Sequence, residues 1–351
     1  MRSGAAETPA WGSMTEEQIG RWQEVMDGVA GMLPDGAVSV LVDGGRHAEM
    51  FAGRLADRLQ ADGRRCVRPD GDGHRDGQGD GPEVRAPVPR TVTLAAGAGW
   101  RQRPPAGGWD VVIWLRTYRA ANGDAEDGAD IVLDLHDISW PVIRHVALHL
   151  AGHGDWFIAE SRAFFGPRAA TWDARFGDDG PAYADAIDEA ALPDGACVVD
   201  VGCGTGRALP ALRRAVGPAG KVIGVDLTPQ MLAAARACDR GRHAVLMLAD
   251  ARRLPFADAR FDAVFAAGLV QHMPDPAAGL AELARITRPG GRLVIFHPSG
   301  RAALAARHGR TLRPDEPLAP ARLGPLLATA GWRLDTYDDP PHRFLALADR
   351  C

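Results

Sequence analysis

Lysine is almost absent from this sequence. Lys221 is the only lysine among 40 basic residues, so arginine carries nearly all of the positive charge. The 45 acidic residues outnumber the basic ones and leave a formal net charge of −5. Proteins that bind nucleic acid usually present a strongly basic surface. The composition therefore gives no reason to expect a nucleic-acid partner.

Cysteine is scarce as well, and long apolar runs are missing. The five cysteines are scattered and form neither a disulfide framework nor a Cys-x-x-Cys metal pattern. No apolar run approaches the roughly 20 residues that cross a bilayer. Residues 1–11 lack the basic start and the apolar core of a secretory signal. These absences favour a soluble, cytoplasmic protein with reduced thiols and no membrane partner.

What the sequence does contain is enough for two domains. Its 351 residues are 46% apolar, which is sufficient for folded cores. The hydrophobic pattern is interrupted at Gly152, His153 and Gly154. We therefore expect an N-terminal domain over residues 12–150 and a C-terminal domain over residues 155–351.

The N-terminal part has the pattern of a small α/β unit. Apolar residues recur at helical spacing over residues 14–32 and 48–61. Short apolar runs predict strands, of which the last two look largely buried, as in a parallel sheet: residues 37–42, 66–68, 109–115 and 129–135. Residues 71–81 hold Gly, His and Asp but nothing apolar to bury, which favours a mobile loop over a metal site.

The order of these elements is similar to that of a known enzyme family. Residues 38–70, with Asp43-Gly44 after the first strand, resemble the opening of P-loop kinases of the uridine kinase type. Residues 109–115 and 129–142 resemble the closing strands of that family. The resemblance implies a P-loop-kinase-like α/β domain.

The phosphate loop itself departs from that family. Such a loop needs a glycine, four further residues, and then glycine, lysine and serine or threonine, so that amides, an ammonium group and a hydroxyl hold phosphate and magnesium. Counted from Gly44, the last three places hold Glu49, Met50 and Phe51. A carboxylate and two apolar side chains cannot perform these tasks. We expect a degenerate domain that has lost nucleotide chemistry and keeps a structural or binding role.

Two features near the expected boundary allow more than one interpretation. His145, His149 and His153 are four residues apart and would share one helix face, where they could bind metal. No paired acidic or cysteine ligand accompanies them, so we prefer a polar helix face. Residues 160–176 are helix-like and aromatic, with an interruption at Gly166-Pro167. Their aromatic side chains either cover a ligand as a lid or dock the segment on the next domain, and docking is the preferred interpretation.

From residue 182 onward, strands alternate with helices. The expected helices are residues 182–191, 207–216, 229–238 and 276–286. The expected strands are residues 197–201, 221–225, 244–248, 261–266 and 292–296. This alternation predicts a doubly wound parallel sheet. Residues 332–337 and 343–348 flank an Asp-Asp-Pro-Pro turn and suit an antiparallel pair.

Residues 197–206 are the most informative stretch of the chain. A short buried strand leads into Gly202, Gly204 and Gly206, and a helix follows. Glycine lets the backbone approach a ligand closely, and the helix start points backbone N–H groups at whatever lies over the loop. The loop alone fits a nicotinamide cofactor, a phosphate or S-adenosylmethionine (SAM). A nicotinamide site needs a third glycine where Arg207 stands.

Acidic residues follow three neighbouring strands and favour SAM. Asp200, at the start of the loop, can accept from an ammonium group, which SAM has and a dinucleotide lacks. Asp226, 20 residues after Gly206, is placed to accept from both ribose hydroxyls. Asp250 could accept from the adenine amino group while the Ala251 amide donates to the ring.

The residues that carry this pattern resemble class I SAM-dependent methyltransferases over about residues 160–350. The matching stretches are residues 198–206, 225–231, 249–256, 261–264 and 288–293. The resemblance implies a Rossmann-like seven-stranded sheet whose last pair includes an antiparallel strand. It also implies that Leu227 or Met231 packs on the adenosine and that residues 268–272 lie beside the sulfonium. The expected cofactor contacts are Asp200, Gly202, Cys203, Gly204, Gly206, Asp226, Leu227, Met231, Asp250, Ala251 and Gly268.

Methyl transfer is an in-line displacement, so the protein mainly supplies alignment and a dry site. A base is needed only if the acceptor is protonated, and His272 and His297 are the candidates at the right sheet edge. Alternatively, His272 caps its loop and His297 orders the turn at Pro298.

The expected function is methyl transfer from SAM to a small-molecule acceptor. The N-terminal domain would then shape the acceptor site or form a homodimer. The alternative is a SAM-binding sensor or scaffold without turnover. The acceptor, a quinone or a specialised metabolite among others, and the choice between O-, N- and C-methylation stay open.

Overall fold

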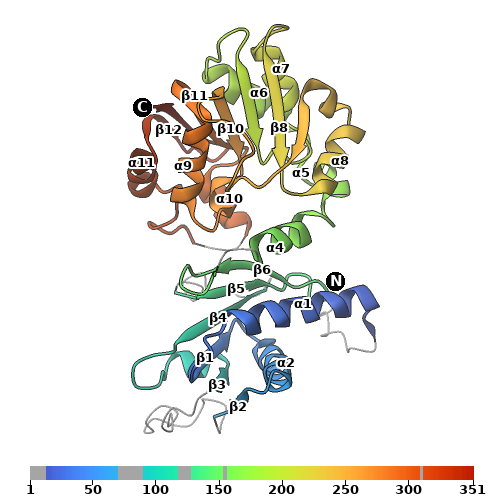
Figure 1. Cartoon of the computed structure of the whole chain (residues 1–351), viewed down its shortest axis with the longest axis vertical. Helices are drawn as coiled ribbons and strands as arrows, with labels where there is room; N and C mark the ends of the chain where they lie inside the picture. Colours follow the sequence, from blue (N-terminus) through green and yellow to red (C-terminus); the bar gives the residue numbers. More distant parts are fainter. Residues whose placement is uncertain (1–12, 70–89, 118–127, 153–155, 309–310) are drawn as a thin grey trace. The chain divides into compact units, whose positions relative to one another are not determined.

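The computed structural model describes residues 13–69, 90–117, 128–152, 156–308 and 311–351. The chain divides into two compact units, Met1–Trp156 and Phe157–Cys351 (Figure 1). Each unit has a sheet of its own. Residues 1–11, the glycine-rich stretch 71–81 and His153, on which expectations were placed, lie outside the described residues. No helix among the described residues is long and apolar enough to cross a membrane.

The N-terminal unit is built on a six-stranded sheet with the order β2-β3-β1-β4-β5-β6. The first five strands are parallel, and β6 runs antiparallel to β5. The strands are β1 (Val38–Asp43), β2 (Arg65–Val67), β3 (Thr91–Ala96), β4 (Val111–Arg116), β5 (Ile131–Asp134) and β6 (Val142–Val146). The four expected strands are confirmed as β1, β2, β4 and β5, while β3 and β6 are additional.

Two amphipathic helices, α1 (Glu16–Met32) and α2 (Ala48–Ala61), confirm the helices expected in this unit. Thr15 begins α1 with a capping box. Its hydroxyl accepts a hydrogen bond from the Gln18 N–H at 3.3 Å, and the Gln18 side chain accepts one from the Thr15 N–H at 2.9 Å. The capping box thus marks the start of α1, whereas α2 begins after His47 without a side-chain cap.

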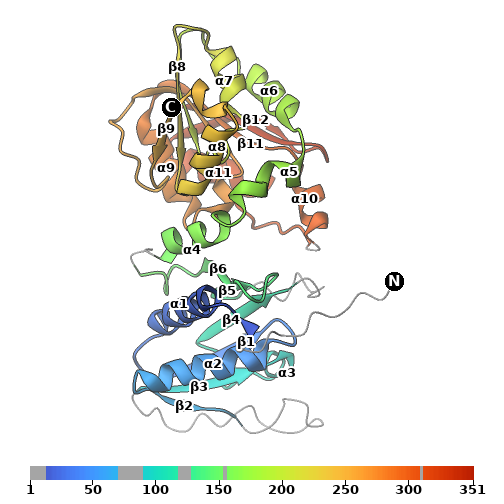
Figure 2. The same ribbon diagram turned by 90° about the vertical axis from the view of Figure 1, so that its right-hand side faces the viewer.

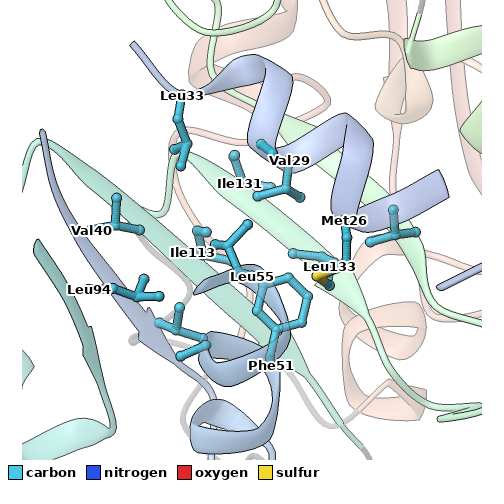
Figure 3. Close-up of a cluster of buried hydrophobic side chains, with 14 of the residues drawn as sticks. Met26, Val29, Leu33, Val40, Phe51, Leu55, Leu94, Ile113, Ile131 and Leu133 are labelled. Atoms are coloured by element: carbon cyan, nitrogen blue, oxygen red, sulfur yellow. The ribbon is translucent and has the colours of Figure 1, made fainter. Parts of the chain in front are cut away.

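The main core of the N-terminal unit lies between these helices and one face of the sheet. Figure 3 shows Val29 of α1 and Phe51 of α2 directed toward strand side chains such as Ile113. All three are fully buried. The short helix α3 (Ala98–Arg101) packs Trp100 with Leu41 in a separate cluster.

The helix expected to carry the three histidines is absent from the described part of this region. His145 lies in β6, and His149 lies in the turn that follows. The β-branched residues of β6 favour an extended strand over a helix. Within the part of the chain that the structure describes, no group of three potential ligands could hold a metal ion. Both helix-based interpretations of these histidines are therefore wrong.

The C-terminal unit contains a seven-stranded sheet with the order β12-β13-β11-β10-β7-β8-β9. Strand β13 runs antiparallel to both neighbours, as the family resemblance implies. The strands are β7 (Cys197–Val201), β8 (Lys221–Asp226), β9 (Val245–Leu248), β10 (Phe261–Ala267), β11 (Thr287–His297), β12 (Trp332–Asp338) and β13 (Phe344–Arg350). The expected seven-stranded architecture is confirmed.

Helices cover both faces of this second sheet (Figure 1). The helices of this unit are α4 (Trp156–Phe165), α5 (Trp172–Phe176), α6 (Gly180–Glu189), α7 (Leu209–Ala215), α8 (Pro229–Ala237), α9 (Pro276–Ile286), α10 (Arg301–Arg307) and α11 (Pro320–Thr329). Of these, α6, α7, α8, α9 and α11 contribute to the cores on the two faces. Figure 2 shows α4 and α5 beside α8, and the short helix η3 (Ala169–Thr171) that links them contacts α8. The interruption expected at Gly166-Pro167 falls between α4 and η3. Helices α10 and α11 are additional to the sequence prediction.

Strand β11 begins earlier than the sequence pattern indicates. It starts at Thr287 rather than Arg292, because Thr287 already pairs with Phe261 of β10. The register then shifts, so that Ala263 pairs with Arg292. Gly290 absorbs the shift with a φ of 73°, a conformation that favours glycine.

Candidate cofactor-binding site

The parallel strands of the second sheet end at one edge, and that edge gathers the acidic residues picked out by the sequence. Asp200 lies in register between Gly224 of β8 and Phe265 of β10. Asp226 is the last residue of β8, and Asp250 follows β9. This is the edge at which open α/β sheets bind ligands.

The glycine loop after β7 has the backbone conformation that glycine permits. Gly202, Gly204 and Gly206 have φ values of 77°, 53° and 80°. A Cβ on Gly206 would lie 2.9 Å from Leu209 Cδ1, so the loop packs closely on α7 at that point. For Gly204, by contrast, no described atom lies within 4 Å of the position that a Cβ would take. The middle of the loop therefore presents bare backbone to open space, as a ligand cradle requires.

Asp226 anchors this loop to the next strand. Its Oδ2 accepts a hydrogen bond from the Gly204 N–H at 2.9 Å, and its Oδ1 accepts one from the Thr228 N–H at 2.7 Å. Burial raises the pKa of this carboxyl, while the backbone hydrogen bonds from Thr228 and Gly204 oppose that rise. Each carboxylate oxygen can accept a second hydrogen bond. The anchored side chain can thus still accept from hydroxyl groups of a ligand.

Asp200 is the most unusual group at the edge. Asp200 is only 1% exposed, and its Oδ1 has no hydrogen-bond donor among the described residues. Burial raises its pKa to about 8, and the nearby Asp226 charge adds to the rise. A buried carboxylate oxygen without a donor is costly for a folded protein. An incoming ammonium group would supply the missing partner, so this residue fits the cationic amino end of SAM.

Asp250 is held by its neighbour Arg252. The guanidinium approaches both carboxylate oxygens, with Nε at 3.1 Å from Oδ1 and Nη2 at 2.7 Å from Oδ2. The Arg252 N–H also donates to Oδ1 at 2.9 Å. The Arg252 Cζ atom lies 4.8 Å from the centre of the Phe157 ring. The half-buried Ala251 lies between these two residues in the chain. A role of Asp250 and Ala251 at adenine stays a prediction.

The apolar residues expected at the cofactor differ in exposure. Met231 in α8 is only 2% exposed and belongs to the interior. Leu227, just after β8, is half-buried and has surface to offer a ligand. Cys203 is buried, and its N–H donates to the Val225 carbonyl at 2.9 Å. Burial raises the pKa of its thiol well above the usual value. Leu227 therefore has more surface than Met231 for contact with adenosine, and a cofactor role of Leu227, Met231 or Cys203 stays a prediction.

Of the two candidate bases, His297 is the last residue of β11, and His272 ends the short helix η5 (Val270–His272) that follows β10. His297 Nδ1 is 2.9 Å from the Ser299 carbonyl and 3.1 Å from the Ser299 nitrogen, so the ring orders the turn at Pro298. Burial lowers the pKa of His297, a hydrogen bond with the Ser299 backbone opposes this, and the Arg307 charge lowers it further. His272 is exposed, and its ring meets the Phe165 ring edge-on at 5.8 Å. Gly268 has a φ of 61° and donates to the Phe296 carbonyl.

One group of residues at the site escapes local sequence patterns. Asp173 of α5 accepts hydrogen bonds from Thr205, Arg207 and Arg240, which are 32, 34 and 67 residues away in the chain. In the sequence, Arg207 stands out only because it occupies the place where a nicotinamide site needs a glycine. Because the partners are distant in sequence, no spacing rule marks Asp173. The only signal in the sequence that points to Asp173 is its place as a charged residue within an aromatic segment.

The aromatic segment 157–176 docks on the loops of its own unit. Arg162 Nε donates to the Leu227 carbonyl at 3.0 Å, Phe157 lies over Arg252, and Phe165 meets His272. Together with Asp173, the segment touches the loops that follow β7, β8, β9 and β10. The side chain of Phe176 lies outside what the structure describes.

Comparison with known proteins finds a family model that matches part of the C-terminal unit and several relatives that match part of the chain. Residues 199–295 match the family model described as a methyltransferase domain. The chain is 43% identical over 105 residues to an uncharacterized 37.1 kDa protein in a transposon of Streptomyces fradiae, covering 30% of each chain. It is 38% identical over 111 residues to a demethylmenaquinone methyltransferase of Halalkalibacterium halodurans, covering 31% of this chain and 45% of that protein. The chain thus spans less than half the length of these curated relatives.

Among solved structures, a SAM-dependent methyltransferase from Aquifex aeolicus is 23% identical to this chain, with a TM-score of 0.43. That likeness covers 52% of this chain and 98% of the other. The matched residues 199–295 include the glycine loop, Asp200, Asp226 and Asp250. Residues 199–295 of the C-terminal unit thus match a methyltransferase domain, and the cofactor that such a domain implies is SAM.

Proposed function

We propose that the C-terminal unit transfers a methyl group from SAM to a small-molecule acceptor. The observation that supports this most strongly is the buried Asp200 carboxyl beside a glycine loop anchored on Asp226. Bound SAM would supply a methyl carbon already activated by its sulfonium. The residues of this chain then need to align that carbon with the acceptor and exclude water.

In this proposal each of the three aspartates binds a different part of the cofactor. Asp200 accepts from the ammonium group, Asp226 from the ribose hydroxyls and Asp250 from the adenine amino group. Arg252 holds the Asp250 carboxylate in one plane through two guanidinium nitrogens. Leu227 packs on the adenosine.

The acceptor lies on the side of Gly268, His272 and His297. His297 is neutral near pH 7 because its pKa is lowered, which suits a base. Its Nδ1 contacts Ser299, so Nε2 is the nitrogen that would take a proton. His272 is the more exposed of the two. Either histidine acts as a base only if the acceptor arrives protonated.

Quinone rings are the first acceptor class to test. A matching relative is named a demethylmenaquinone methyltransferase, although the match covers 31% of this chain. The competing function is a SAM-binding sensor without turnover. Incubation of the intact protein with methyl-labelled SAM and a cell extract, read by mass spectrometry, separates them. We expect S-adenosylhomocysteine (SAH) and one labelled small molecule, whereas SAM binding without SAH formation would favour the sensor.

We also propose that residues 12–150 form a degenerate P-loop-kinase-like domain. Phe51, at the place of the magnesium-binding hydroxyl, is fully buried in the core. Asp43 faces its own loop, because its Oδ1 accepts from the Gly44 N–H at 2.7 Å and its Oδ2 pairs with Arg101 Nε at 2.9 Å. Glu49 pairs with Arg68. These contacts pair the charges at the loop with other residues of the chain and support the loss of nucleotide chemistry.

The assignment of Asp226 predicts a loss of cofactor affinity on truncation. We expect Asp226→Ala to weaken SAH binding by about tenfold or more, because it removes both the ribose acceptor and the anchor of Gly204. Titration calorimetry measures the effect. Asp185→Ala, at an exposed position on α6, is the matched control and should bind as the wild type does. Equal affinity of the Asp226 variant would refute the assignment.

The raised pKa of Asp200 predicts a pH-dependent change in stability. The folded protein keeps a proton at Asp200 up to about pH 8, whereas the unfolded chain loses it near pH 4, so this group costs more stability as pH rises through that window. We expect Asp200→Asn to raise the thermal midpoint at pH 8 and to have less effect near pH 4. The same variant should lose SAH affinity. A midpoint difference independent of pH would contradict this reading.

A base at His272 predicts a separation of turnover from binding. His272→Ala should lower the rate of SAH formation while SAH affinity stays close to that of the wild type. His342→Ala, in the exposed turn between β12 and β13, serves as control. Undiminished turnover of the His272 variant would leave His297 as the candidate.

Loss of the phosphate site predicts no response to nucleotide in the N-terminal unit. ATP with Mg²⁺ should not shift the thermal midpoint of the Asp226→Ala protein, in which binding at the cofactor site is weakened. SAH should still shift the wild-type midpoint, which shows that the assay responds. A magnesium-dependent shift with ATP would overturn the proposed loss.

A further inference from the structure

The loop that holds Gly204 and Gly206 is held by two carboxylates, one from the sheet and one from helix α5. Asp226 holds it from the sheet through the Gly204 N–H. Asp173 of α5 holds the same loop through Thr205, because its Oδ1 accepts a hydrogen bond from the Thr205 hydroxyl at 2.8 Å. Thr205 is only 2% exposed, so its side chain is enclosed by these contacts.

Two arginines complete the arrangement around Thr205. Arg207 Nε donates to Asp173 Oδ1 at 2.9 Å, and Arg240 Nη1 donates to Asp173 Oδ2 at 2.8 Å. Arg240 Nη1 also lies 3.1 Å from the Thr205 carbonyl oxygen. Arg207 forms an ion pair with Asp179 as well, and its Nη2 donates to the Gly177 carbonyl at 3.2 Å. The carboxylate of Asp173 is thus the common partner of the loop and both guanidinium groups.

These contacts are charged and largely shielded from water. The Arg207 side chain is 8% exposed and that of Asp173 is 28% exposed. Burial alone would raise the pKa of Asp173, but the hydrogen bonds from Thr205 and Arg207 bring it below its usual value, so the carboxylate is ionised at neutral pH. Hydrogen bonds between charged groups are stronger than neutral ones.

A loop rich in glycine has many conformations to lose when it binds a ligand. A clamp that already selects one of them reduces the free-energy cost of binding. We propose that Asp173 is a positioning residue that holds Thr205, and with it the glycine loop, in the form that binds SAM. The proposal rests on the proposed function. It extends the cofactor site to a residue that lies outside the matched segment 199–295.

The test compares three variants of the intact protein by titration calorimetry with SAH. Asp173→Asn keeps the size of the side chain but removes the charge, and we expect about a tenfold or greater loss of affinity, mainly through faster dissociation. Asp173→Glu keeps the carboxylate and should recover part of the affinity. Asp178→Asn, at an exposed position five residues after Asp173, is the matched control and should bind as the wild type does.

The outcomes are distinguishable. Binding of SAH by Asp173→Asn within twofold of the wild type, even with a lower thermal midpoint, overturns the positioning role. Equal losses in Asp173→Asn and Asp173→Glu also overturn it, because the charge would then be irrelevant. If Asp173→Asn does not fold, Thr205→Val removes the clamped hydroxyl alone and should lose affinity in the same direction, whereas unchanged affinity refutes the proposal. Failure of the wild type to bind SAH would instead refute the proposed function.

Discussion

The hydrogen bond from the Gly204 N–H to the Asp226 carboxylate joins the two strands on which the cofactor site depends. It uses the amide at the centre of the glycine loop to fix the Asp226 side chain, which we propose contacts the ribose. That amide is committed, and the bare Cα of Gly204 faces open space. The nearby Asp200 carboxyl, in the strand before the loop, is buried without a donor on Oδ1 among the described residues. A site that is costly to maintain in the free protein is thereby prepared for a cationic ligand.

The N-terminal unit shows what the same kind of opening becomes when its ligand residues are replaced. Its first strand also ends in an aspartate followed by glycine, but Asp43 accepts from Gly44 and pairs with Arg101. Phe51 is directed into the core. The carboxylates of Asp43 and Glu49 near that loop both have partners within the unit. The Asp43 carboxylate therefore has a partner on each oxygen, whereas Asp200 Oδ1 lacks one among the described residues, and this difference supports a cofactor in the second unit.

The features that sequence could predict are those with local causes. Alternating glycines, strand-tip aspartates and helical periodicity are read within a few residues, and β7, α2 and α9 lie where the pattern places them. Strand β3 escaped because Thr91–Ala96 has few large apolar residues, and His145 was misplaced because four-residue spacing does not by itself specify a helix. The Asp173 clamp could not be predicted at all, since its partners converge from segments up to 67 residues away.

The central claim is that Asp200 exchanges a proton for the ammonium group of the cofactor. Calorimetry of SAH binding at about pH 6.5, where an amino group is protonated, in two buffers with different ionisation enthalpies measures this exchange. Because the pKa of Asp200 is about 8 in the free protein, binding should release about one proton, and the Asp200→Asn variant should release none under conditions where it still binds. Binding by the wild type without proton release would contradict the account.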